Sequence, residues 1–474
     1  MTKKRPKVLF ASAECAPFAK VGGLGDVAGS LPSALKKIGV DIAVVIPKYE
    51  FISSQFLCKK IIQGMKVKKE KINVWQGFLP DTDISVYFLE NKKFFGEHGV
   101  YFEKTPWAGS FKQIARFLFF SEAVLELATF LNVEIIHCND WHTAMIPLLS
   151  SLRREKIKTI LTIHNLSSQG KWPPKEVLDF LELETSQHPQ LKLRAKHTKK
   201  FNIFQQGILA TDIINAVSPT YRQEILTSEF GEGLEKDLRK REKDLYGILN
   251  GLDTERFNPQ KDKDIARNYS FKDIKKKAVN KTELQKTCGL PVGEKIPLLG
   301  LVGRLTTQKG IEIIAKAFPR LVKLGCQLVV LGSGGKEHEA MLKKLAKKYP
   351  QNLSLNLKFD TVMGQQIYAG TDIFLMPSLF EPCGLGQLIA QRYGTIPVVR
   401  ETGGLADTVV EGKTGFLFQD YKAKDFLKAL RRALEAYYNE KQWQKIIKQA
   451  MAKDFSWHKS AQEYLKLYQR LLKE

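Results

Sequence analysis

The hydrophobic residues of the chain fall into short apolar runs, and longer amphipathic segments separate these runs. Short runs bounded by glycine and polar residues are typical of buried strands. The segment 111–130 repeats Ile114, Phe117, Leu118 and Leu125 at helical spacing. The repeated order of strand, loop and helix predicts an α/β protein. The expected strands lie at 7–12, 40–46, 135–138, 159–163, 209–217, 297–303, 327–331, 373–376 and 396–399, and two short apolar runs between turns lie at 74–78 and 84–89.

The length of 474 residues is too great for one ordinary core. A strand with a tight turn at 248–253 ends a first series of strands and helices, and a charged, turn-rich segment follows from 258 to about 286. A second series then begins. We therefore expect two doubly wound, Rossmann-like domains that face each other across a cleft, followed by an amphipathic helix. The expected divisions are 1–255, 256–455 and 456–474.

A glycine-rich turn, KVGGLGD at 20–26, follows the first expected strand and precedes a helical pattern. In α/β sheets this order of strand, turn and helix often holds a phosphate, because the start of the helix offers free N–H groups. The turn has neither the Gly-Lys-Ser/Thr of a Walker loop nor the Gly-x-Gly-x-x-Gly of a dinucleotide site. A tight turn with a solvated lysine is the alternative.

A second candidate turn follows the expected strand at 373–376. The chain passes through Glu381, Pro382, Cys383 and Gly384 and enters a helix at about Leu385. Proline fixes one φ angle and glycine allows the backbone to approach a ligand, so N–H donors would lie beside a carboxylate. Such a site suits an anion next to a polyol. A further glycine turn at 402–404 follows the next strand, and two ordinary strand-to-helix turns are the alternative.

Polar residues also stand at the ends of two strands in the first half of the chain. His137, Asp140 and His142 follow one strand, and His164 and Asn165 follow the next. Ligands of open parallel sheets bind at this end of the strands. The spacing fits no standard zinc motif, so a ligand-facing polar cluster is favoured over a metal site. A capped core histidine remains the alternative for His164.

The formal net charge of +24 raises the question of nucleic-acid binding. The lysines recur through most surface-like segments, and the chain has no RNP-like aromatic motif or recognition helix. A solvated basic surface that attracts small anionic substrates is therefore favoured. The sequence also lacks a long apolar run, a signal-like h-region and any Cys-x-x-Cys pair among its 6 cysteines. We expect reduced thiols in a cytoplasmic enzyme without a membrane span.

A set of ordered motifs covers nearly the whole chain: KVGGL at 20–24, HCNDWH at 137–142, TIHN at 162–165, VSPTY at 217–221, GILNGLD at 247–253, GRLTTQKG at 303–310, PSLFEPCG at 377–384, RYGT at 392–395 and GGL at 403–405. This set resembles that of bacterial glycogen synthases and plant starch synthases. The resemblance implies the GT-B architecture, with the last helix returning to the first domain. It also implies retaining transfer of glucose from ADP-glucose to the non-reducing end of an α-1,4-glucan, with no metal or other cofactor.

The resemblance also implies roles for individual residues. Arg304 and Lys309 match the pair that stabilises the leaving diphosphate, and Glu381 matches the acid that holds sugar hydroxyls and the positive anomeric centre. His164 and Asp140 match residues beside the donor sugar, and the five together are the expected catalytic set. The expected substrate-binding residues are Lys20, Gly22, Gly23, Asp26, Asn250, Phe359 (against the base), Cys383, Gly384, Leu385 and Tyr101 (near the acceptor).

Some positions differ from the family pattern. Many related retaining transferases carry a second acid where this chain has Ile389, and the synthases commonly lack it. Three segments expected in the acceptor-facing domain also differ, at 112–117, 168–170 and 205–207. Two alternatives stay open: use of UDP-glucose or another acceptor, and an inactive glucan-binding paralogue. The intact set of Lys20 and the candidate catalytic residues argues against the paralogue.

Overall fold

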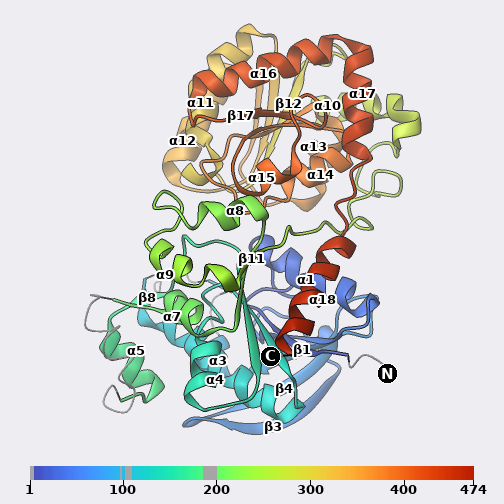
Figure 1. Ribbon diagram of the computed structural model, residues 1–474. Coiled ribbons are helices and arrows are strands. Elements are labelled where there is room, and N and C mark those ends of the chain that lie inside the picture. Colours follow the sequence, from blue (N-terminus) through green and yellow to red (C-terminus); the bar gives the residue numbers. More distant parts are fainter. Residues whose placement is uncertain (1–4, 97–98, 102–108, 185–199, 474) are drawn as a thin grey trace. The chain divides into compact units, whose positions relative to one another are not determined.

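The computed structural model describes residues 5–96, 99–101, 109–184 and 200–473. Packing divides the chain into two compact units. Unit 1 comprises Met1–Gly251 and Trp457–Glu474, and unit 2 comprises Leu252–Ser456. Figure 1 shows the elements of each unit in sequence colours. No helix within the described ranges is both long and apolar enough to cross a membrane.

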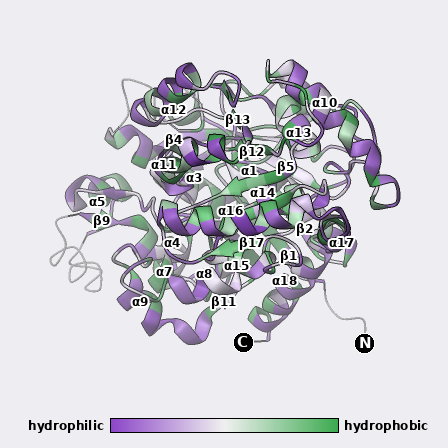
Figure 2. Ribbon diagram, turned by 90° about the horizontal axis from the view of Figure 1, so that it is seen from above, coloured by the Kyte–Doolittle hydropathy of each residue, from purple (hydrophilic) through white to green (hydrophobic). Residues whose placement is uncertain are grey.

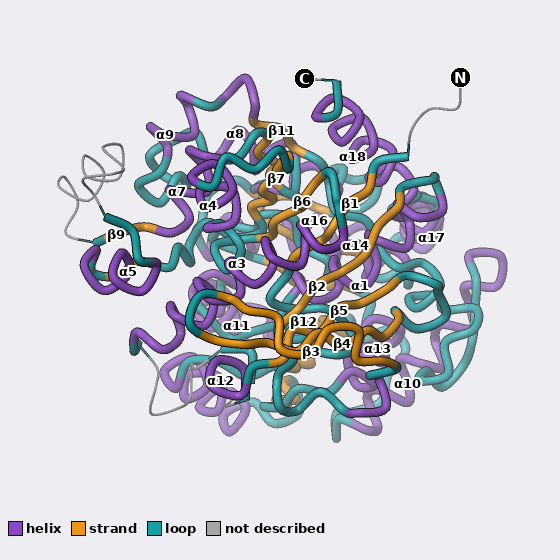
Figure 3. Tube along the Cα trace, turned by 90° about the horizontal axis from the view of Figure 1, so that it is seen from below, coloured by secondary structure: helices purple, strands orange, loops and turns teal. Residues whose placement is uncertain are grey.

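Unit 1 is built on a sheet that has nine strands within the described residues, in the order β11-β10-β7-β6-β1-β2-β5-β4-β3. The strands from β11 to β5 are parallel, whereas β4 runs antiparallel to both β5 and β3. Figure 3 shows β3 and β4 side by side at one edge. The strands are β1 (Lys7–Ala11), β2 (Asp41–Pro47), β3 (Lys59–Val67), β4 (Glu70–Phe78), β5 (Ser85–Glu90), β6 (Ile135–Asn139), β7 (Lys158–Ile163), β10 (Ile213–Ala216) and β11 (Leu245–Gly247).

The last helix of the chain is part of the core of unit 1. It packs against the first helix, and its tyrosines are buried. The Tyr468 hydroxyl lies 2.7 Å from Nδ1 of His137, and Asn215 Nδ2 donates to the Tyr464 hydroxyl at 2.9 Å. The helices of unit 1 are α1 (Gly23–Lys37), α2 (Lys92–Phe95), α3 (Phe111–Leu131), α4 (Met145–Leu152), α5 (Pro174–Leu181), α7 (Ile203–Ala210), α8 (Pro219–Glu224), α9 (Glu235–Lys240) and α18 (Trp457–Leu471). A small hairpin pairs β8 (Lys171–Trp172) with β9 (Phe201–Asn202).

Unit 2 contains a six-stranded parallel sheet in the order β14-β13-β12-β15-β16-β17. Numbered from its own first strand, this is the order 3-2-1-4-5-6 of a doubly wound Rossmann sheet. The strands are β12 (Leu298–Val302), β13 (Gln327–Leu331), β14 (Leu353–Asn356), β15 (Ile373–Met376), β16 (Ile396–Arg400) and β17 (Phe416–Phe418). The helices are α10 (Lys277–Thr287), α11 (Ile311–Lys323), α12 (Lys336–Lys348), α13 (Thr361–Gly370), α14 (Gly386–Arg392), α15 (Gly403–Thr408), α16 (Ala423–Tyr438) and α17 (Glu440–Met451).

Hydrophobic residues concentrate on the strands and on the inward faces of the helices, as the hydropathy colours of Figure 2 show. The apolar residues of β13 and β15 are all buried, which explains their continuous apolar sequence. The expectation of an α/β fold with parallel sheets is confirmed.

The expected strand at 248–253 is wrong, because the strand in this region is β11, which ends at Gly247. Beyond it the chain leaves the sheet, and Leu252 N instead donates to Phe455 O at 2.6 Å. The expected strand at 209–217 is shorter than its apolar run. Its first residues complete α7, and only Ile213–Ala216 pair as β10.

Candidate active site

Two loops meet at the topological switch point of unit 2, where β12 and β15 are neighbours and their following connections diverge. Doubly wound sheets bind ligands at this point. Leu379 N donates to Gln308 O at 2.9 Å, so the loops share a backbone hydrogen bond. Gly310 has a φ of 72°, and a Cβ there would lie 2.0 Å from Pro377 O. Only glycine allows this approach, which brings the Arg304–Lys309 segment beside Glu381.

The Glu381 carboxylate is the centre of this half of the site. It is 5% exposed, and Lys309 Nζ donates to both of its oxygens, at 2.9 Å and 2.6 Å. Ser378 Oγ donates to Oε2 at 3.0 Å. An ammonium group has three donors, so Lys309 keeps one for another acceptor. The structure thus brings two of the expected catalytic residues into direct contact.

Arg304 and Phe359 are exposed residues that follow the ends of two strands in unit 2. Arg304 follows β12, and its guanidinium makes no hydrogen bond or ion pair with any residue that the structure describes. Phe359 follows β14 and is 77% exposed. A free guanidinium suits an anion, and an exposed aromatic face suits a base. Within the described residues, neither side chain forms a hydrogen bond or ion pair with Glu381.

The turn from Cys383 to Leu385 is held by a buried amide. Gln387 Nε2 donates to the carbonyl oxygens of Cys383 and Gly384, at 3.0 Å and 3.1 Å, and to Thr408 Oγ1 at 3.1 Å. Gly384 has a φ of 76°, which favours glycine. Cys383 is buried and Leu385 precedes α14 as its N-cap. The sequence did not indicate this role of Gln387.

Replacing Gly403 with alanine will test how closely the neighbouring glycine turn at 402–404 packs against the backbone of Glu381. The new Cβ would lie 2.0 Å from Glu381 O, so the Glu381 backbone must shift. A displacement of about 1 Å near reacting groups can reduce turnover on the order of a hundredfold. Gly412→Ala is the matched control, because Gly412 also has a positive φ (66°) but has nothing within 4 Å of its Cβ position. Comparable kcat values for both variants would contradict the expectation.

Asp140 and His164 form a second cluster, at the carboxyl ends of β6 and β7 in unit 1. Asp140 Oδ1 accepts from His164 N at 2.7 Å and from Asn165 N at 3.2 Å. Burial raises the pKa of Asp140 to about 7, against the effect of these two bonds. Although His164 is partly exposed, desolvation lowers its pKa to about 3, so it is neutral at pH 7. The second carboxylate oxygen of Asp140 has no partner within the described residues.

The tautomer of His164 follows from its neighbour. Asn139 Nδ2 donates to Ala11 O at 3.0 Å, so its Oδ1 is the atom that faces His164 Nε2 at 2.9 Å. An oxygen can only accept, and therefore Nε2 carries the proton. The bare Nδ1 of His164 is left as an acceptor for a hydroxyl group.

The raised pKa of Asp140 predicts a pH-dependent stability difference. The stability that this group contributes is fully present below its ordinary pKa of 3.8 and is lost as pH rises through about 7. Asp140→Asn removes the titration, so the melting temperature of the variant will rise relative to wild type from pH 5 to pH 8. Between pH 5 and pH 8 the relative change in the free energy of unfolding is at most about 3 kcal/mol. Asp81→Asn, at an exposed residue with a similar φ of 59°, should show no such trend. Parallel pH profiles for Asp140→Asn and wild type would refute the assignment.

The glycine turn of unit 1 pairs its own residues. Lys20 Nζ lies 2.6 Å from Asp26 Oδ1, Gly22 N donates to Glu14 Oε2 at 2.8 Å, and Gly23 begins α1. The Tyr101 hydroxyl donates to Glu14 Oε1 at 2.6 Å. The structure therefore connects Gly22 and Tyr101 through an acid that the sequence analysis did not identify. Its position just after an apolar strand is the signal that was available.

Asn250 is 6% exposed, and its Oδ1 has no hydrogen-bond partner among the described residues. A buried amide oxygen without a partner costs stability, so it is suited to bind a ligand hydroxyl. The Asn250 side chain forms no hydrogen bond with the other candidate residues in the described part of the chain.

Curated relatives match nearly the whole length of this chain. A glycogen synthase of Thermotoga petrophila is 43% identical over 491 residues, which cover 98% of this chain and 99% of the relative. The chain belongs to the glycogen synthase family. A glycogen synthase of Bacillus cereus is 41% identical over 98% of this chain and 99% of its own length. The model of the starch synthase catalytic domain matches residues 7–240, and that of glycosyl transferases group 1 matches residues 288–452.

Solved structures agree with this family. The catalytic domain of starch synthase IV from Arabidopsis thaliana, bound to ADP and acarbose, has a TM-score of 0.90 and 33% identity, covering 99% of this chain and 100% of that one. Sucrose-phosphate synthase from Thermosynechococcus elongatus, with a TM-score of 0.63 and 18% identity over 99% of both chains, shows similarity of fold alone. The chain is a glycosyltransferase, and the expected GT-B fold is confirmed.

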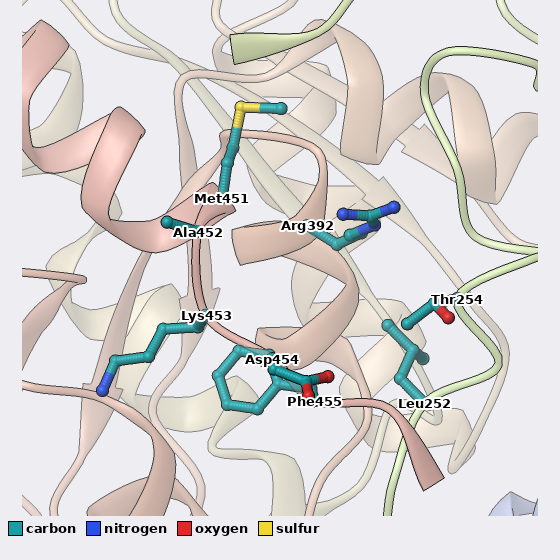
Figure 4. A pocket seen from close by; sticks show the side chains of 8 residues that line it. All are labelled: Leu252, Thr254, Arg392, Met451, Ala452, Lys453, Asp454 and Phe455. Atoms are coloured by element: carbon teal, nitrogen blue, oxygen red, sulfur yellow. The ribbon is translucent and has the colours of Figure 1, made fainter. Parts of the chain in front are cut away.

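Other features of this glycogen synthase family member lie apart from the candidate residues. Both ring nitrogens of His137 are used in the core, by Tyr468 and Thr162. Within the described ranges no three His, Cys, Asp or Glu side chains are grouped to hold a metal ion. A cavity of about 240 Å³ in unit 2 contains no candidate residue. Its lining, shown in Figure 4, is Leu252, Thr254, Arg392, Met451, Ala452, Lys453, Asp454 and Phe455.

Proposed function

We propose that this protein transfers glucose from ADP-glucose to the non-reducing end of an α-1,4-glucan, with retention of configuration. The contact between Lys309 and Glu381, in the segment that also carries the unpaired guanidinium of Arg304, carries the proposal. The ligands of the Arabidopsis starch synthase IV structure, ADP and acarbose, support a donor with adenosine diphosphate and an acceptor made of glucose-like rings. The family membership supports the glucan product.

In the proposed reaction, the bond between glucose and diphosphate breaks and leaves two developing charges. Arg304 and the remaining N–H of Lys309 stabilise the negative leaving group, a role that other transferases give to a metal ion. The Glu381 carboxylate stabilises the positive anomeric carbon. Lys309 Nζ donates to both oxygens of Glu381 and would also meet the diphosphate, so it would hold the carboxylate close to the leaving group. We therefore propose a metal-independent reaction.

The unit 1 residues supply hydrogen-bond acceptors for sugar hydroxyls in this scheme. His164 Nδ1, the free oxygen of Asp140 and Asn250 Oδ1 can each accept from a hydroxyl group. The position that would hold a second acid is Ile389, which is buried in α14. With no carboxylate there to act as nucleophile, we propose attack by the acceptor hydroxyl on the face that the diphosphate leaves.

Glucose transfer from radiolabelled ADP-glucose to glycogen, measured in EDTA, tests this proposal. We expect incorporation into the glucan that EDTA does not reduce and that is weak with UDP-glucose. Preference for UDP-glucose would correct the donor, because stacking of a base on Phe359 does not by itself choose between bases. Absence of transfer from either donor, with ADP-glucose still bound, would favour the inactive glucan-binding paralogue.

We also propose a cytoplasmic location for this protein. All six cysteines are free thiols, and Cys58 is exposed. Unpaired cysteines are typical of proteins kept in a reducing compartment. Fractionation of the native cells, with detection of the protein by antibody, would test this proposal.

A further inference from the structure

After β1 the chain makes a closed turn, which brings Val21 and Gly22 back to the side chain of Glu14. Ser12 Oγ donates to Glu14 O at 2.6 Å, and Glu14 N donates to Ser12 Oγ at 3.2 Å, which fixes the backbone of the acid. Cys15 and Ala19 then exchange both backbone hydrogen bonds, at 2.8 Å and 2.9 Å. This closed turn places the start of the glycine-rich segment against the Glu14 carboxylate.

Both oxygens of Glu14 are occupied. Oε2 accepts from Val21 N at 2.7 Å and from Gly22 N at 2.8 Å, and Oε1 accepts from the Tyr101 hydroxyl at 2.6 Å. The residue is 2% exposed, and no cation among the described residues forms an ion pair with it. Its charge is therefore stabilised by three hydrogen bonds and by the N-terminal end of α1. A buried acid without a cation is costly, so its contacts must hold it closely.

Two consequences follow for the residues around it. The N–H groups of Val21 and Gly22 are already used, so the shape of the glycine turn is set before any substrate binds. The Tyr101 ring is fixed through its hydroxyl, and it lies 5.2 Å from the ring of His142. Glu14 therefore connects two segments that are far apart in the sequence. Because both oxygens are occupied and buried, the acid itself cannot contact substrate.

We propose that Glu14 is a positioning residue for glucosyl transfer, which holds the glycine turn and the Tyr101 ring in one fixed arrangement so that Lys20 and Tyr101 meet the substrate correctly. This inference rests on the proposed function. A glutamine can replace the acid in this role. Its amide oxygen accepts from both backbone N–H groups, and its amide nitrogen can donate to the Tyr101 hydroxyl. An alanine removes all three bonds.

Kinetics of Glu14→Gln and Glu14→Ala test this role, with Glu50→Ala, at an exposed acid of unit 1, as the control. We expect Glu14→Gln to keep kcat within about threefold and Glu14→Ala to lower it on the order of a hundredfold. The KM for the donor should change less than about threefold in both, because Arg304 and Lys309 lie in unit 2 and are untouched. The amides of residues 21 and 22 should exchange hydrogen faster in Glu14→Ala only.

Several results would overturn the inference. Equal loss of activity in Glu14→Gln and Glu14→Ala would mean that transfer depends on the negative charge of Glu14 and not on its hydrogen bonds. Normal kcat in Glu14→Ala, with only a lower melting temperature, would mean a purely structural residue. If Glu14→Ala does not fold, Tyr101→Phe decides, because it removes only the hydrogen bond to Glu14 Oε1. An unchanged kcat in Tyr101→Phe would show that this bond does not position the ring. An inactive wild type would refute the proposed function, and the exchange rates would still report whether Glu14 holds the turn.

Discussion

Replacing Glu381 with glutamine will lower the kcat of glucose transfer by about a hundred- to a thousandfold. The effect is of the size seen when one preorganised electrostatic group is removed from an active site. Glutamine has the same shape but no charge, so the positive anomeric carbon loses its stabilising partner. Lys309, which donates to both carboxylate oxygens, would also face one oxygen and one amide group. Radiolabel incorporation at saturating ADP-glucose measures the change.

Donor binding and a matched acid separate this prediction from general damage. ADP binding to Glu381→Gln, measured by calorimetry, should stay within about tenfold of wild type, because Arg304 and Lys309 remain. Glu401→Gln changes an exposed acid at the end of β16 in the same unit and should keep normal activity. Full activity in Glu381→Gln would exclude Glu381 from the reaction. Loss of ADP binding together with activity would assign it to donor binding instead.

A chain that ends at Ser456 will fail to form a stable first unit. Truncation removes α18, which buries Trp457, Tyr464, Tyr468 and Leu471. Each large side chain contributes about 1.5–3 kcal/mol by burial, and a domain is stable by only about 5–15 kcal/mol. His137 and Asn215 would also lose their partners inside the core. Thermal unfolding and proteolysis should show that residues 1–251 are largely unfolded.

A single substitution gives the same test at smaller scale. Tyr468→Phe leaves Nδ1 of His137 without a partner in the core, which should cost about 1–3 kcal/mol. Tyr438→Phe removes a hydroxyl from a side chain that is 63% exposed and should leave the melting temperature unchanged. If the truncated chain and the Tyr468→Phe variant both melt as wild type does, α18 contributes nothing to the core.

The sequence predicted best those elements whose packing is uniform along their length. The strands at 327–331 and 373–376 match β13 and β15 residue for residue, because both faces of each strand are buried and every position except Gln327 is apolar. The prediction failed at β11, which is three residues long and buries only Leu245 fully. Local pattern cannot show where so short a strand pairs.

The candidate site was only partly visible for a related reason. Lys309 and Glu381 were found by their motifs, but their contact depends on two loops that are 72 positions apart and meet through Gly310. Glu14 was missed because its partners Val21 and Gly22 bind through backbone N–H groups, which every residue except proline has. No choice of residue type in the turn marks such a contact.

The place of α18 in unit 1 also determines the order in which the protein can be completed on the ribosome. Unit 2 is continuous in the chain, whereas unit 1 needs residues from both ends. During translation, the surface of unit 1 that α18 covers therefore stays exposed until α18 has been synthesised. The unit whose synthesis starts first is the one that is finished last, and the nascent chain must protect that surface for the whole time that unit 2 is being made.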